Sequence, residues 1–242
     1  TRQYTQIASN ITGGGVQQVT NIAYDGASMF ITDRGGSGTQ LRTLSSSGVA
    51  SASRGTILAA GFIDEFIGLS FGNGTLYSTA RGNERLTTIN RTNAATTQPG
   101  PVNYATGDVI SGKLAFVGSI LYGTIEVFGG TNGLYSFNLS NGAATLLGNG
   151  GAPSTYLNMI AFANGSTLYG INGTTLYQIN TANGSLTNLG AITGTNLPSS
   201  LVGAVIVPGF EPAVSTPTSS AVASTSATLG GNVTADGGAT IT

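Results

Sequence analysis

The sequence contains no cysteine and no histidine. Without them it can form no disulfide, no Ser-His-Asp or Cys-His catalytic arrangement, and no metal site with imidazole or thiolate ligands. Tryptophan is also absent, which removes the aromatic residue that sugar-binding platforms commonly use. Nine carboxylates are left for acid and base chemistry. We expect no catalytic residues, no metal and no cofactor.

Charged residues are scarce, at 7% of the chain with a formal net charge of −1. A nucleic-acid-binding face or an electrostatically held membrane surface requires clustered basic side chains. The lone lysine, Lys113, and the scattered arginines cannot form such a face. No apolar run has the length that crossing a bilayer requires. The composition therefore argues against nucleic-acid binding and against membrane insertion.

Glycine is abundant, with 38 residues, and 40% of the chain is hydrophobic. Segments between the turns can therefore pack rather than remain disordered, which predicts a folded β protein. A surface poor in lysine and rich in Ser, Thr, Asn and Gly is typical of bacterial extracellular proteins. The chain starts at Thr1, which a removed signal peptide would explain, as would a sequence that simply begins there. We expect secretion and an extracellular or cell-surface location.

A unit of about 45 residues occurs four times in the first 210 residues. A Leu-Tyr-like pair opens the second strand of each copy, at Met29-Phe30, Leu76-Tyr77, Leu121-Tyr122 and Leu168-Tyr169. The third strands also recur, beginning at Gln40, Arg85, Leu134 and Leu176. Strands bounded by Gly and Asn turns, at this period, are typical of four-stranded propeller blades. The sequence therefore predicts an all-β fold with a small β-propeller over residues 1–210.

Adjacent Leu and Tyr side chains lie on opposite faces of a strand, so both faces of each sheet should be covered. Radial packing of blades provides such cover. Two successive sandwich domains are the alternative. Leu201 to Val207 is similar to an innermost strand without its blade, and Tyr4 to Ala8 to an outermost one. We expect both chain ends to form a partial fifth blade, which closes the ring and leaves no bare strand edge.

Residues 211–219 have the Pro/Ser/Thr composition of a linker, and residues 220–242 follow as further strands. The segment SATLGGNVTADGGATIT resembles the opening of the immunoglobulin-like or fibronectin type III-like repeats of bacterial surface proteins. Such a sandwich needs about 100 residues, so this segment implies either a longer chain or completion of a sheet in a neighbouring molecule. The expected assembly strands contain Thr228, Leu229, Val233, Ala239 and Ile241.

Three carboxylates, Asp64, Glu65 and Asp108, precede first strands, where propeller loops border the central channel. Paired carboxylates there could hydrolyse a glycoside or hold calcium. We favour the alternative that they are solvated loop residues or caps on backbone N–H groups. They are our weak ligand-binding candidates.

Tyrosines recur at fixed places in the repeat: Tyr77, Tyr122, Tyr135, Tyr169 and Tyr177. They could stack on sugars, but packing between blades fits their regular placement better. Possible glycosylation motifs, N-x-S/T, begin at Asn10, Asn73, Asn90, Asn138, Asn164, Asn172, Asn183 and Asn232. Several of these coincide with Asn-Gly turns that hairpin geometry itself favours.

The sequence thus resembles a bacterial secreted propeller protein followed by the start of an immunoglobulin-like surface-protein repeat. This resemblance implies a non-catalytic extracellular structural protein. We expect a subunit of a surface filament that self-associates head-to-tail by strand addition through the C-terminal tail. The alternatives are a carbohydrate-binding or adhesion module of a longer surface protein, with surface glycans as partners, and a glycosidase.

Overall fold

The computed structural model describes residues 3–4, 11–36, 38–58, 66–80, 85–101, 109–194, 201, 203–205, 213–214, 218–220, 228–230 and 233–235. The chain divides into two compact units, Thr1–Ile206 and Val207–Thr242. Secondary structure in the described residues is β, apart from one short 3-10 helix, η1 (Pro153–Tyr156). In these residues no helix has the length and apolar character to span a membrane.

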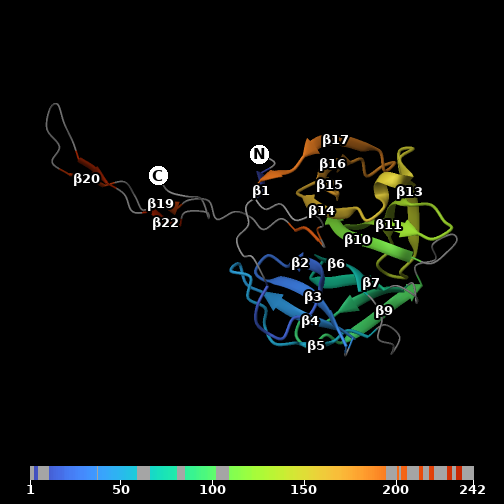
Figure 1. Cartoon of the computed structure of the whole chain (residues 1–242), viewed down its shortest axis with the longest axis horizontal. Coiled ribbons are helices and arrows are strands. Elements are labelled where there is room, and N and C mark those ends of the chain that lie inside the picture. Colours follow the sequence, from blue (N-terminus) through green and yellow to red (C-terminus); the bar gives the residue numbers. More distant parts are fainter. Residues whose placement is uncertain are drawn as a thin grey trace. The chain divides into compact units, whose positions relative to one another are not determined.

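The first unit contains four antiparallel sheets, each made of four consecutive strands (Figure 1). The blade 1 strands are β2 (Val19–Tyr24), β3 (Met29–Gly35), β4 (Gly38–Leu44) and β5 (Gly55–Thr56); the blade 2 strands are β6 (Phe66–Gly72), β7 (Thr75–Ala80), β8 (Arg85–Ile89) and β9 (Thr96–Pro101). The blade 3 strands are β10 (Val109–Val117), β11 (Ile120–Val127), β12 (Gly133–Phe137) and β13 (Ala144–Gly148); the blade 4 strands are β14 (Ile160–Asn164), β15 (Thr167–Asn172), β16 (Thr175–Ile179) and β17 (Leu186–Ala191). This is a four-bladed β-propeller-like arrangement, so the predicted repeat and its strand order are confirmed.

Core side chains lie between consecutive blades. Each of three hydrophobic clusters joins one blade to the next: blades 1 and 2, blades 2 and 3, and blades 3 and 4. The inner strands β2, β6, β10 and β14 contact one another in that order. Leu76 and Tyr77, although on opposite faces of β7, are both buried. Both faces of this sheet are therefore covered, which confirms the prediction from the adjacent Leu and Tyr.

A repeated loop follows the third strand of blades 2, 3 and 4. In blade 3 the side-chain Oδ1 of Asn138 accepts the backbone N–H of Ser140, and Oδ1 of Asn141 accepts that of Ala143. The fifth loop residue has a left-handed backbone, at Ala94, Gly142 and Gly184. An Asn side chain can accept a hydrogen bond from the backbone N–H two residues later. Such bonds stabilise a turn that has no strand pairing of its own.

This loop rests against a fourth-strand glycine of the preceding blade. A Cβ on Gly55, Gly100 or Gly148 would lie 2.5, 2.1 or 2.4 Å from the carbonyl oxygen of Asn93, Asn141 or Asn183. Each glycine also pairs with a third-strand leucine of its own blade, namely Leu41, Leu86 or Leu134. Backbone meets backbone at these three boundaries, which leaves no space for a side chain.

The ends of the first unit meet in one short parallel pairing. β1 (Gln3–Tyr4) pairs with β18 (Thr193–Gly194), which follows β17. Residues 201 and 203–205 are described but belong to no strand, and residues 5–10 and 195–200 lie outside the described part. The predicted partial fifth blade stays a prediction.

The described residues of the second unit form two antiparallel pairings. β19 (Ala213–Val214) pairs with β22 (Val233–Ala235), and β20 (Thr218–Ser220) pairs with β21 (Thr228–Gly230). Ala213 pairs with Ala235 and Ser219 with Leu229 in a common register, but a one-residue shift within the first pairing brings Val214 opposite Val233. Apart from this irregularity, one hairpin register relates the two pairs. β19 and most of β20 fall in the segment expected to be a linker, and the immunoglobulin-like assignment stays a prediction.

Tyr156 gives the fold a predicted sensitivity to alkali. Its side chain is fully buried, and its hydroxyl donates a 2.6 Å hydrogen bond to the Gly184 carbonyl. Burial raises the pKa of this phenol above its ordinary value. Above about pH 10 the unfolded chain loses the proton while the folded chain keeps it, so the stabilisation present at lower pH is lost as pH rises.

We therefore expect the free energy of unfolding to fall as the pH rises above about 10, as measured by urea titration at about pH 8 and about pH 11. Tyr156→Phe should cost about 1 kcal/mol near pH 8 because the hydrogen bond is lost, and it should flatten the fall toward pH 11. An equally steep fall in the variant would contradict the assignment to Tyr156.

Candidate functional site

The three carboxylates singled out in the sequence, Asp64, Glu65 and Asp108, lie outside the described residues. The carboxylates that are described are Asp25, Asp33 and Glu126, and none of them is free of a polar or electrostatic partner. Nor does the described part contain a group of acidic side chains that could hold a metal ion. Two of the described carboxylates, Asp25 and Asp33, are engaged in ion pairs.

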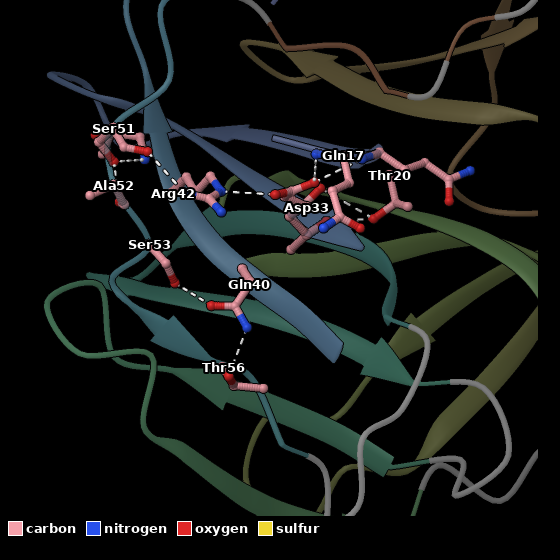
Figure 2. A network of polar contacts seen from close by, with 12 residues as sticks. Gln17, Thr20, Asp33, Gln40, Arg42, Ser51, Ala52, Ser53 and Thr56 are labelled. Atoms are coloured by element: carbon pink, nitrogen blue, oxygen red, sulfur yellow. Dashed lines mark hydrogen bonds and ion pairs between the residues drawn. The ribbon is translucent and has the colours of Figure 1, made fainter. Parts of the chain in front are cut away.

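A buried ion pair links β3 to β4 in blade 1. Arg42 Nε donates to Asp33 Oδ2 at 2.9 Å, and the two side chains are 7% and 2% exposed (Figure 2). Asp33 Oδ1 accepts the backbone N–H groups of Gln17 and Gln18, each at 2.8 Å. Arg42 Nη1 donates to the Ser51 carbonyl. The ion pair therefore holds two flanking segments against blade 1: the one before β2, through Gln17 and Gln18, and the one after β4, through Ser51.

A second ion pair joins blades 1 and 2. Arg91 Nη1 contacts Asp25 Oδ2, and its guanidinium lies 5.0 Å from the centre of the Phe71 ring. Burial raises the pKa of Asp25, but backbone N–H groups of Ser28 and Ala27 together with Arg91 hold it below its ordinary value overall. Asp25 is thus an ionised residue of the turn between β2 and β3.

The lone lysine lies on the propeller axis. Four inner-strand residues occupy the same position of the repeat, because each pairs with the equivalent residue of the second strand in its own blade. They are Asn21, Gly68, Lys113 and Ile160. Lys113 Nζ donates to Asn21 Oδ1 at 2.7 Å and to the Thr20 carbonyl at 2.9 Å. Although β6 lies between them in ring order, β10 and β2 are thereby joined across the axis.

This bridge is part of a larger polar network between the blades. Asn21 Nδ2 donates in turn to Thr32 Oγ1 and to the Phe66 carbonyl, which extends the network into blade 2. The hollow beside Lys113 and Asn21 measures only about 10 Å³. A water molecule needs roughly that much space or slightly more, so little free volume remains there.

A larger pocket of about 110 Å³, which we call the axial pocket, lies beside this small hollow. Leu69, Leu114 and Ala204 line both the pocket and the small hollow. Every blade contributes an aromatic side chain to the pocket wall: Tyr24, Phe71, Phe116 and Phe162. All four are half-buried. No charged side chain is among the described residues that line it.

Sequence reasoning missed this pocket, although a signal was present. Tyr24, Phe71 and Phe116 occupy one position of the repeat, opposite Met29, Leu76 and Leu121. In blade 4 this position holds Ala163, and Phe162 precedes it. An inner-strand aromatic six residues before each Phe or Tyr of the second strands could have been noted in the first three copies.

Tyr77, Tyr122 and Tyr135 are buried, which favours blade packing over sugar stacking. Tyr77 lies 5.5 Å from the ring of Phe116 in the next blade. Tyr169 and Tyr177 are half-buried, and Tyr169 stacks on Phe162 with 5.4 Å between ring centres.

The possible glycosylation motifs differ in access. The exposed asparagines are Asn73, Asn90, Asn138, Asn164 and Asn183. Asn172 is half-buried, and its Nδ2 donates to the carbonyls of Thr155 and Leu157. Asn10 and Asn232 lie outside the described residues. Attachment of glycans stays a prediction.

The four sheets define a β-propeller-like repeat domain, and a small β unit follows it in the chain. Neither a protein-family model nor a curated protein matches the chain.

Proposed function

We propose that this chain is a non-catalytic structural protein of a bacterial surface, a subunit of a filament that assembles head-to-tail. The propeller is the rigid head, and the tail hairpin supplies strands to a neighbouring copy. The single observation that carries this proposal is the hairpin register of the second unit, because a two-stranded hairpin leaves a backbone edge on each strand.

The tail needs a partner on energetic grounds. An isolated two-stranded hairpin is marginally stable at best, and three or more strands with a covered face are needed for independent stability. Strand addition satisfies unpaired backbone groups with main-chain hydrogen bonds. A contact between two different surfaces that does not close a ring propagates into a fibre.

The head has the properties of a scaffold. Described carboxylates have partners in ion pairs or other interactions, and the axis is bridged by Lys113. Hydrophobic clusters and backbone contacts fasten each blade to the next. A surface location agrees with the low charge and the Ser, Thr, Asn and Gly content.

Two finer features belong to the same proposal. The segment 203–205 would contribute to a partial fifth blade, since a Cβ on Gly203 would lie 2.9 Å from the Ile22 side chain of β2. The β1–β18 pairing would supply its outer part. The tail would form the first strands of an immunoglobulin-like sandwich.

Assembly can be tested at Leu229, which pairs with Ser219 between β21 and β20. Proline removes a backbone N–H and is poorly tolerated inside a paired strand. We expect filaments of the parent chain in negative-stain microscopy, and their loss in Leu229→Pro with unchanged propeller melting. The matched variant Leu229→Val should assemble like the parent. Monomers of the parent at all concentrations, or unaltered filaments of Leu229→Pro, would overturn the proposal.

A second candidate function is a carbohydrate-binding or adhesion module on a longer surface protein. The four half-buried aromatic side chains of the axial pocket favour it. Glycosidase activity has no comparable support, since the candidate carboxylates lie outside the described residues.

A further inference from the structure

The structure assigns a ligand site to the axial pocket: we infer that it binds one ring of an uncharged sugar. This inference rests on the second candidate function and is independent of filament assembly. It places recognition on aromatic side chains of the inner strands, not on Asp64, Glu65 or Asp108.

The shape of the pocket limits the size of its ligand. Its volume of about 110 Å³ is well below the roughly 300–1,000 Å³ of pockets for drug-sized molecules. The Lys113–Asn21 hydrogen bond lies beside the small hollow that shares lining residues with this pocket. The small volume therefore favours a single ring over an oligosaccharide.

Three of the four aromatic side chains that line the pocket are contacted by neighbouring groups. Phe162 stacks on Tyr169, and the Arg91 guanidinium covers Phe71. The Phe116 ring lies so close to Gly72 that a Cβ there would come within 2.4 Å of it. Supported rings lose little freedom when a ligand arrives, which favours binding through preorganisation.

The chemistry of the lining selects an uncharged ligand with an apolar face and hydroxyl groups. An ionised ligand would lose hydration without gaining an opposite charge from the described lining. The Tyr24 hydroxyl donates to the Gly26 carbonyl at 2.8 Å, so it has acceptor capacity for a ligand hydroxyl. Ser70 adds a second hydroxyl to the wall. A pyranose presents C–H groups to aromatic rings and O–H groups to such acceptors.

Ala163 offers a test that preserves the fold. It occupies the repeat position that holds Tyr24, Phe71 and Phe116 in the other blades, so Ala163→Phe places a ring where the other blades have one. The added ring fills the pocket. Thr187→Phe, at an exposed position of β17, is the matched control because it adds the same side chain away from the axis.

The experiment is saturation-transfer NMR with the full chain and a panel of neutral hexoses, followed by titration of the best one. We expect binding by the parent and by Thr187→Phe, and at least a roughly tenfold weaker affinity for Ala163→Phe with unchanged melting temperature. The uronic acid of the same hexose should bind more weakly than the neutral sugar. No binding of any neutral hexose by the parent, equal binding by Ala163→Phe, or tighter binding of the uronic acid would each overturn the inference. Filament formation is scored separately in the Leu229 variants, so the two proposals fail independently.

Discussion

Replacing Asp33 with alanine is expected to lower the free energy of unfolding of the propeller by roughly 3–5 kcal/mol. The substitution leaves the Arg42 guanidinium buried without its 2.9 Å carboxylate partner. It also removes the acceptor of the Gln17 and Gln18 N–H groups. A buried charge without a partner is far costlier than the paired arrangement, because desolvation is no longer offset.

Chemical denaturation of the full chain measures this loss. The double variant Asp33→Leu with Arg42→Met is the control, since it removes both charges and keeps apolar volume. It should recover most of the stability lost in Asp33→Ala, because buried ion pairs contribute little net free energy compared with apolar packing. A loss below about 1 kcal/mol in Asp33→Ala would show that the pair is solvated.

Gly100→Ala is expected to destabilise the boundary between blades 2 and 3 by at least about 2 kcal/mol. The new Cβ would lie 2.1 Å from the Asn141 carbonyl oxygen, and this contact is with backbone that cannot rotate away. The carbonyl belongs to the Asn loop of blade 3, so relief requires the two blades to separate. For a domain of this size the melting temperature should fall by roughly 4–8 °C.

Gly36→Ala is the matched control. A Cβ at Gly36 meets nothing within 4 Å, and this glycine has no left-handed backbone that alanine would strain. Its free energy of unfolding should therefore stay within about 0.5 kcal/mol of the parent value, and its melting temperature should barely change. Equal effects of the two substitutions would contradict the tight blade boundary.

The repeated strands were predictable because each copy carries its own local signals. Leu121-Tyr122 opens a second strand, and Asn141-Gly142 turns the third strand into the fourth. Such signals depend on side-chain alternation and turn chemistry within about 45 residues. They do not reveal which residues of different blades meet.

The axial site was not predictable for the same reason. Lys113 and Asn21 are distant in sequence and belong to blades that are not adjacent in the ring, yet their side chains meet at 2.7 Å. The Asp33–Arg42 pair likewise depends on the β3–β4 register and on a segment that precedes β2. Packing of the blades around one another brings Lys113 and Asn21 together, whereas the Asp33–Arg42 pair forms within blade 1.

The amino-acid sequence by itself determined the β class, the fourfold repeat and the absence of histidine and thiol chemistry, because strand periodicity and composition are local properties. The tertiary structure decided which glycines meet a neighbouring blade, where the single lysine points and that four aromatic residues share one pocket. These are distances between blades, and packing of whole sheets against one another sets them.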